Sequence, residues 1–127
     1  MHIVHLEDTK PLRDIFLATM TALRPGCKVE QFINSDDTIK YVEEHIDDID
    51  IFLLDMRVPG SVNGLGVAEK IKELQGSGLI AMTSGYMPPS KEQLAALDAC
   101  WYKKPWQIED LQDMLKRADA ARKPTTS

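Results

Sequence analysis

The sequence predicts an α/β domain in which a parallel sheet of five strands is covered by helices on both faces. Short apolar runs alternate with segments of helical spacing along the chain. Strictly alternating strands and helices imply parallel strands joined by right-handed crossovers. The length of 127 residues suits one domain with its own core. The periodicity leaves the order of the strands open.

The expected strands are five short runs rich in apolar or β-branched residues. The third run, "IFLL", has four consecutive apolar residues. Four residues are too few for a free-standing helix and are typical of a strand buried on both faces. The five runs cover residues 3–6, 28–33, 51–54, 79–82 and 100–102.

Apolar residues between and after these runs recur at helical spacing, so a helix is expected after each strand. The fourth helical segment opens with Ser90 and Gln93, the pattern of a capping box. The helical patterns cover residues 12–23, 39–46, 67–74, 90–99 and 108–118. We expect the domain to span residues 1–120 and a disordered tail to occupy residues 121–127.

The composition excludes several classes of function. The net charge is −5 and no cluster of Lys or Arg is larger than a pair, so no broad basic surface is available for nucleic acid. No apolar run approaches the ~18 residues of a membrane span, and the start "MHIVHLED" does not resemble a signal peptide. We therefore expect a cytoplasmic protein. Cys27 and Cys100 form no C-x-x-C pair, which indicates reduced, mostly buried thiols instead of redox or zinc chemistry.

Reactive side chains gather at the expected carboxyl ends of the strands. In an open parallel sheet, ligands bind outside these ends, at the point where the winding of the chain reverses. The residues that follow the five strands are Glu7 and Asp8, Asn34 and Ser35, Asp55, Thr83 and Ser84, and Lys103 and Lys104. The functional site is therefore expected at this edge of the sheet.

If the first and third strands are neighbours, the carboxylates of Glu7, Asp8 and Asp55 converge. Two such charges repel each other by about 4 kcal/mol at an effective dielectric constant near 20, so a cation must offset them. An all-oxygen cluster of this kind suits Mg²⁺. The alternative is that the acids are solvated loop residues that cap the helix near Pro11, and this suffices for any one acid taken alone.

The combination with Thr83 and Lys104 favours a phosphoryl site over capping residues. A hydroxyl donor and a fixed cation are groups that stabilise a phosphoryl group, and a carboxylate can attack phosphorus to form an acyl phosphate. Asp55 is the best candidate nucleophile because the rigid third strand would hold it at the centre of the site.

These residues together resemble the receiver domains of the response regulators of two-component signalling. The resemblance runs from about His2 to Arg117 and rests on four motifs: "VHLEDT", "LLDMRVPG", "AMTSG" and "WYKKPW". Each motif is weak alone, but their order and their places on predicted strand ends make the set highly specific. The resemblance implies a flavodoxin-like fold with strand order 2-1-3-4-5, which places the first and third strands side by side.

The resemblance implies that Asp55 is a phosphoacceptor that receives a phosphoryl group from a sensor histidine kinase or a phosphotransfer protein. It also implies a Mg²⁺ site. Asp8, Asp55 and the backbone carbonyl of Arg57 would bind the ion directly, and Glu7 would act through a metal-bound water.

The resemblance further implies that Thr83 hydrogen-bonds the phosphoryl group and that Lys104 pairs with it, with a cis Lys104-Pro105 bond. Phosphorylation would draw Thr83 inward, and the aromatic residue three positions before the lysine, Trp101, would follow. Tryptophan departs from the usual tyrosine or phenylalanine here. The alternative is a purely structural Trp101 that packs beside Trp106.

Two further positions differ from the common family pattern. The loop from Pro59 to Gly64 has four intervening residues where the commonest form has three, which leaves its path open. Arg57 and Gly85 occupy positions at which the family tunes hydrolysis of the acyl phosphate. A long cation could shield the phosphoryl group and glycine offers no side chain to position water, so we expect a comparatively long-lived phosphorylated state.

We expect a phosphorylation-controlled signalling switch, which is not an enzyme but takes part in its own phosphorylation and slow dephosphorylation. Its output would pass to a downstream protein through the face of the fourth helix, fifth strand and fifth helix, and homodimerisation through that face stays open. One alternative is a pseudo-receiver that binds a partner regardless of phosphorylation. A phosphate-ester hydrolase is the other, although no second Asp follows Asp55 at the spacing that a general acid needs.

Overall fold

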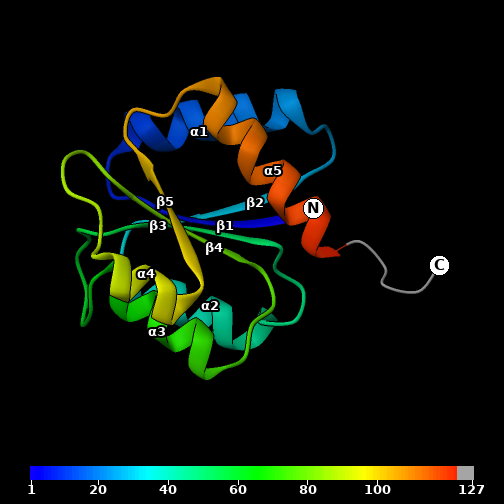
Figure 1. Ribbon diagram of the computed structural model, residues 1–127. Coiled ribbons are helices and arrows are strands. Elements are labelled where there is room, and N and C mark those ends of the chain that lie inside the picture. Colours follow the sequence, from blue (N-terminus) through cyan, green and yellow to red (C-terminus); the bar gives the residue numbers. More distant parts are fainter. Residues whose placement is uncertain (123–127) are drawn as a thin grey trace.

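The computed structural model describes residues 1–122, and it confirms the predicted sheet. Five parallel strands lie in the order β2-β1-β3-β4-β5 (Figure 1). Their bounds are β1 (His2–Leu6), β2 (Lys28–Phe32), β3 (Ile51–Asp55), β4 (Leu79–Ser84) and β5 (Ala99–Lys103). The strand order implied by the resemblance is therefore confirmed, and β1 and β3 are hydrogen-bonded neighbours.

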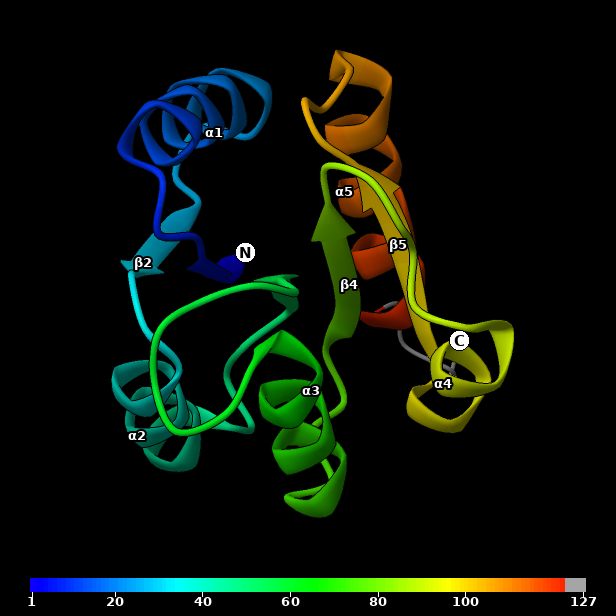
Figure 2. The same ribbon diagram turned by 90° about the vertical axis from the view of Figure 1, so that its left-hand side faces the viewer.

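Helices cover both faces of the sheet, as predicted. Figures 1 and 2 show α1 (Lys10–Leu23) and α5 (Ile108–Arg122) on one face. The other face carries α2 (Ser35–His45), α3 (Gly64–Glu73) and α4 (Lys91–Leu97). Because α5 continues to Arg122, the prediction of a disordered tail from residue 121 is wrong for its first two residues. Residues 123–127 of that predicted tail lie outside the described residues.

Several strand and helix ends differ from the sequence prediction: backbone pairing extends one strand past its apolar residues, and a left-handed residue ends one helix early. Strand β4 extends to Ser84, so Thr83 lies within the strand and pairs in register with Asp55. The helix expected over residues 90–99 ends at Leu97, where Asp98 adopts a left-handed conformation with φ 50°. Its Ser90/Gln93 capping box is confirmed, with hydrogen bonds in both directions.

The core consists of two clusters, one on each face of the sheet. Strand β3 is buried along its whole length, as its apolar run predicts. Neighbouring residues of β1 alternate between the faces: Val4 and Leu6 belong to the cluster with α2, α3 and α4, whereas Ile3 packs with α1 and α5. Because both faces of β3 are packed, Asp55 at its end is held on a rigid support.

Helix α3 begins in close contact with the end of β3. Gly64 is its first residue, and a β-carbon at this position would overlap the backbone carbonyl oxygen of Asp55. Asn63 caps the helix by accepting a hydrogen bond from the amide of Gly66, at 3.0 Å. Glycine at position 64 therefore lets the loop after Asp55 return directly onto the strand.

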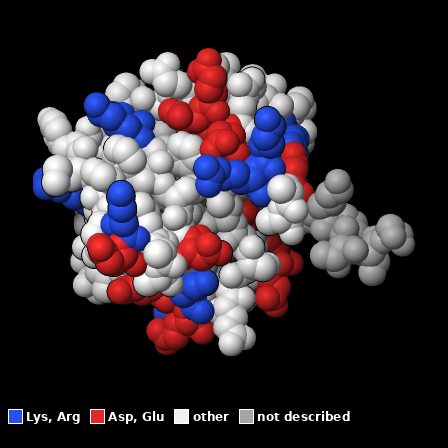
Figure 3. All heavy atoms as spheres, in the orientation of Figure 1, with Lys and Arg blue, Asp and Glu red and all other residues white. Residues whose placement is uncertain are grey.

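On the described part of the face in Figure 3, acidic and basic side chains are interspersed, and the group of basic side chains toward the upper right lies directly beside acidic ones. Within residues 1–122, no helix combines the length and the apolar character that crossing a membrane requires. Cys27 and Cys100 are both free thiols and half-buried.

Candidate functional site

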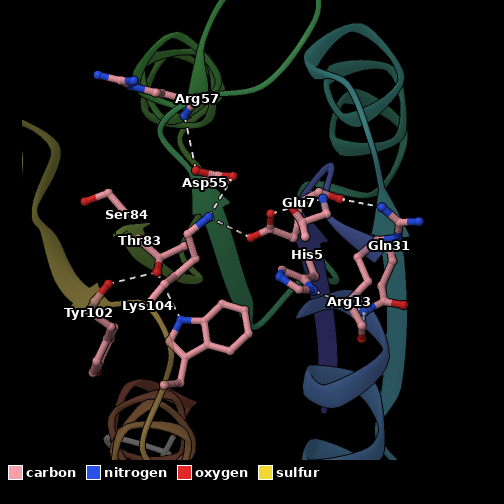
Figure 4. Close-up of polar contacts among 12 residues, drawn as sticks. His5, Glu7, Arg13, Gln31, Asp55, Arg57, Thr83, Ser84, Tyr102 and Lys104 are labelled. Atoms are coloured by element: carbon pink, nitrogen blue, oxygen red, sulfur yellow. Dashed lines mark hydrogen bonds and ion pairs between the residues drawn. The ribbon is translucent and has the colours of Figure 1, made fainter. Parts of the chain in front are cut away.

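A pocket with a volume of about 540 Å³ lies at the carboxyl ends of the strands. It forms where residues after β1, β3, β4 and β5 meet at one edge of the sheet (Figure 4). Its lining residues are Asp8, Thr9, Asp55, Met56, Arg57, Asn63, Ser84, Gly85, Tyr86, Met87 and Lys104. We call this the site pocket. It contains five of the residues predicted for the site, namely Asp8, Asp55, Arg57, Gly85 and Lys104.

Three carboxylates converge at this pocket. Oxygen atoms of Glu7, Asp8 and Asp55 all lie within 4.8 Å of one another. Glu7 is fully buried and Asp55 is 4% exposed, whereas Asp8 is exposed. The pairing of β1 with β3 brings them together because Glu7 directly follows β1 and Asp55 ends β3. The predicted convergence of the three acids is thus observed.

The ammonium group of Lys104 lies between the two buried carboxylates. Its Nζ atom is 3.0 Å from Asp55 Oδ2 and 3.1 Å from Glu7 Oε1. Lys104 follows β5, and the Lys104-Pro105 bond is cis, as the resemblance implied. Lys103, the preceding residue, is exposed. One cation therefore offsets two negative charges in a partly buried place.

Burial and charge shift the titration of this group of side chains. Burial, followed by the charge of Asp55, raises the pKa of Glu7, although hydrogen bonds from Lys104 and the amide of Thr9 oppose the shift. Burial alone would lower the pKa of Lys104, but its hydrogen bonds to Asp55 and Glu7 outweigh this and raise it. The ammonium group therefore stays charged over the whole neutral range.

Backbone groups fix the remaining carboxylate oxygens. The amide of Arg57 donates to Asp55 Oδ1 at 3.2 Å, and the amide of Thr9 donates to Glu7 Oε2 at 3.2 Å. Arg13 also donates to the backbone carbonyl of Glu7, at 3.0 Å. Each buried carboxylate thus has one oxygen on Lys104 and one on a backbone amide, which orients both groups before any ligand arrives.

Thr83 lies beside Asp55 in the sheet, but its hydroxyl group is engaged elsewhere. The hydroxyl donates to the backbone carbonyl of Tyr102 at 2.8 Å. The indole nitrogen of Trp106 donates to the same hydroxyl oxygen at 3.0 Å. Thr83 is fully buried and does not line the site pocket. Its predicted bond to a phosphoryl group therefore requires a rotation.

The sequence did not predict the bond between Trp106 and Thr83. The only available signal was the place of Trp106 two residues after Lys104, near the other strand ends. Trp101, the predicted partner of Thr83 in the switch, donates instead to Ser84 Oγ at 2.9 Å. Trp101 and Trp106 also pack on opposite faces of the sheet, so the alternative that Trp101 packs beside Trp106 is wrong.

The loop between β3 and α3 is tied to the start of α2, which settles the path that the sequence left open. Ser61 binds Asp36 twice, through its amide at 3.1 Å and its hydroxyl at 2.5 Å. The amide of Ser35 donates to the carbonyl of Pro59 at 2.9 Å. Gly60 supplies the turn with φ 127°. The longer loop is therefore held beside α2, and Asn63 near its end lines the site pocket.

Arg57 and Gly85 both line the site pocket: Arg57 comes two residues after Asp55 of β3, and Gly85 directly follows the neighbouring strand β4. The side chain of Arg57 is exposed, and Figure 4 shows it pointing away from Asp55. A β-carbon built at Gly85 would have no neighbouring heavy atom within 4 Å. In this arrangement neither residue occupies the space directly above Asp55.

The donor set fits Mg²⁺. The ion prefers carboxylate, carbonyl and water oxygens and keeps several waters when it binds one or two carboxylates. Here Asp55, the exposed Asp8 and Arg57 line the pocket. The buried Glu7 does not line it, but its carboxylate lies within 4.8 Å of the other two. One fixed ammonium leaves a net negative charge on the three acids, so a divalent cation is electrostatically favoured.

Comparisons with known proteins agree with these observations. A family model, "Response regulator receiver domain", matches residues 3–116. A comparison with curated protein sequences finds no match.

Solved structures share the fold at low sequence identity. The chemotaxis protein CheY4 of Vibrio cholerae is 19% identical, with a TM-score of 0.77, over 92% of this chain and 97% of that one. A CheY-like receiver domain protein of Methanospirillum hungatei is 20% identical, with a TM-score of 0.75, over 94% of each chain. The receiver domain of the hybrid histidine kinase CckA is 21% identical, with a TM-score of 0.75, over 93% of this chain and 98% of that one.

Replacing Lys104 with methionine is expected to lower the free energy of unfolding by about 3 kcal/mol near neutral pH, because two buried carboxylates lose their shared cation. This loss of stability in Lys104→Met should be smaller in mildly acidic buffer, because a protonated Glu7 no longer needs a cation beside it. The raised pKa of Glu7 means that the folded state binds this proton more tightly than the unfolded chain, so stability falls as pH rises above about 4.5.

Urea unfolding of the wild type and of Lys104→Met, at neutral pH and in mildly acidic buffer, measures the two losses of stability. Lys103→Met is the matched control, because it removes the neighbouring exposed ammonium and leaves the acids paired. An equal loss for the two variants, or a loss at Lys104 that does not depend on pH, would contradict the charge balance described above.

Proposed function

Because this chain belongs to the family of response regulator receiver domains, we propose that it is a signalling switch controlled by phosphorylation of Asp55. One observation carries the proposal: the Lys104 ammonium bridges buried Asp55 and Glu7 beside exposed Asp8. That arrangement orients the Asp55 carboxylate beside a fixed cation at the edge of an open pocket. These are the requirements of a carboxylate nucleophile.

The proposed reaction is transfer of a phosphoryl group to Asp55. A carboxylate oxygen forms a bond to phosphorus while the bond to the donor breaks, and the leaving group, a kinase imidazole or a carboxylate, keeps the electron pair. Lys104 neutralises charge on the phosphoryl oxygens, and Thr83 donates its hydroxyl hydrogen to one of them after rotating. The chain thus assists its own phosphorylation without turning over a substrate.

Asp8, Asp55 and the backbone carbonyl of Arg57 would hold Mg²⁺ directly, and Glu7 would hold it through a water molecule. When bound, the ion neutralises charge on the phosphoryl oxygens. The support is the fit of the donor set, with three carboxylates within 4.8 Å of one another.

The proposed partners are proteins. A sensor histidine kinase or a phosphotransfer protein supplies the phosphoryl group, and a downstream protein reads the face of α4, β5 and α5. The receiver domain of a hybrid histidine kinase among the similar structures supports a kinase pathway. We place these events in the cytoplasm. Trp101 belongs to the proposed output face, and homodimerisation through that face would use the same elements.

A pseudo-receiver, which binds a partner regardless of phosphorylation, is the second candidate. Two observations favour it: the hydroxyl of Thr83 is held by Tyr102 and Trp106, and Trp101 is anchored to Ser84. Both arrangements oppose the side-chain movements that a phosphorylation switch uses.

Incubation with acetyl phosphate and Mg²⁺, followed by intact-mass measurement, separates the candidates. We expect the wild type to gain one phosphoryl group and Asp55→Asn, which is isosteric but a poor nucleophile, to gain none. Removal of Mg²⁺ with a chelator should also abolish the gain. An unmodified wild type under all conditions would support the pseudo-receiver, and repeated turnover of unrelated phosphate esters would support a hydrolase.

The lifetime of the acyl phosphate is a second measurable property. We expect a state that persists well beyond seconds, because Gly85 offers no side chain to position water and Arg57 carries a long cation at the pocket. In Figure 4 the side chain of Arg57 points away from Asp55, so it must turn toward a bound phosphoryl group to shield it. Arg57→Ala should therefore shorten the lifetime.

Loss of the phosphoryl mass with time, measured after the donor is removed, gives this lifetime. Lys103→Ala is the control, because it removes an exposed cation that does not line the pocket. A lifetime of seconds that Arg57→Ala leaves unchanged would contradict the expected shielding.

A further inference from the structure

We infer that Trp106 is a positioning residue that holds the Thr83 hydroxyl away from Asp55 until a phosphoryl group displaces it. The inference rests on the proposed function, because it names the group that resists the movement of Thr83. It also means that, when Thr83 moves on phosphorylation, the aromatic side chain that moves first is Trp106 and not Trp101. We call the hydrogen bond from Trp106 to Thr83 the indole latch.

The hydrogen bonds of Thr83 define the latch. A hydroxyl group has one hydrogen to donate and two lone pairs to accept with. In this structure the hydrogen is directed to the carbonyl of Tyr102 at 2.8 Å, and one lone pair accepts from the Trp106 indole at 3.0 Å. To donate to a phosphoryl oxygen on Asp55, the hydroxyl must leave the Tyr102 carbonyl and turn away from the indole.

The surroundings of Trp106 make the bond to Thr83 important for the indole. Its ring packs against His5 and Phe16, with ring centroids 5.5 and 5.6 Å away. His5 is fully buried and accepts at Nδ1 from the side-chain amide of Gln31, so its hydrogen is on Nε2. Among the described residues, that Nε2 has no hydrogen-bond partner. The N–H group of His5, next to the Trp106 ring, therefore already lacks an acceptor in the described part of the chain.

Release of Trp106 from Thr83 would leave a second N–H donor, that of the indole, without an acceptor beside His5 and Phe16. Trp106 is half-buried, and an N–H group shielded from water that loses its partner is destabilising, so the indole is expected to shift until its N–H reaches another acceptor or water. The shift would change the packing on His5 of β1 and Phe16 of α1. Phosphorylation of Asp55 would thus change the packing of α1, on the face of the sheet opposite to Trp101.

Trp101 is not held in this way. Its indole donates to Ser84 Oγ at 2.9 Å, and Ser84 in turn donates to the carbonyl of Met87 at 2.7 Å. This pair of bonds does not include Thr83, so it can persist when Thr83 rotates. Trp101 therefore serves as an internal control for any change at Trp106.

The two indole N–H resonances of ¹⁵N-labelled protein test the latch, because the chain has two tryptophans. Trp101→Phe and Trp106→Phe assign the two signals. Addition of Mg²⁺ and beryllofluoride, a mimic of the phosphoryl group on a carboxylate, should move the Trp106 signal and speed its exchange with solvent. Thr83→Val, which lacks the hydroxyl but keeps the shape, should show the Trp106 signal already displaced without any addition.

Affinity gives the second readout. Wild type must break the indole latch to bind beryllofluoride, whereas Trp106→Phe has no latch to break. A hydrogen bond of ordinary net strength corresponds to a gain of about threefold to tenfold in affinity for Trp106→Phe. The matched variant Trp101→Phe leaves the bonds of Thr83 intact and should stay within about twofold of wild type.

The outcomes separate the latch from the proposed function. An acyl phosphate on wild type, seen by intact mass, with an unmoved Trp106 signal would overturn the latch alone. Unchanged or weaker beryllofluoride binding by a folded Trp106→Phe, or a Thr83→Val variant whose Trp106 signal matches wild type, would also overturn it. A wild type that gains neither phosphoryl group nor beryllofluoride would overturn the proposed function and the latch together.

Discussion

The ammonium of Lys104 is the interaction on which the rest of the site depends. It is 3.0 Å from Asp55 and 3.1 Å from Glu7, and two carboxylates this close and this buried would otherwise repel each other strongly. The sheet brings the acids together through the β1–β3 pairing, and the chain after β5 supplies the cation. Strands that are distant in sequence therefore have to assemble correctly before Asp55 can be buried beside its counter-ion.

Much of the fold could be predicted because its signals are local. The buried run Ile51–Leu54 and the capping box at Ser90 each depend on a few neighbouring residues, and both were confirmed. The ends of elements were less predictable. Strand β4 continues through Thr83 because its backbone pairs with Asp55 in β3, and α5 continues to Arg122; neither follows from apolar periodicity.

The charged part of the site was predictable, because acids and a lysine that occur together at the ends of parallel strands must lie close to one another and balance their charges. The bonds made by uncharged polar groups were not. Nothing in the sequence indicates that Thr83 accepts from Trp106 and donates to Tyr102, since both partners become neighbours only when β4 and β5 pair. The switch residue expected by resemblance, Trp101, proved to be bonded to Ser84. The path of the loop after Asp55 likewise depends on Asp36, in a separate helix.

The central claim is that Asp55, held by Lys104, is the residue that takes the phosphoryl group. A crystal structure of the full chain with Mg²⁺ and beryllofluoride tests it most directly. We predict beryllium bonded to a carboxylate oxygen of Asp55, with the Lys104 ammonium within hydrogen-bonding distance of a fluorine. Beryllofluoride bonded to Asp8, or an unmodified Asp55 still paired with Lys104 at saturating beryllofluoride, would contradict the claim.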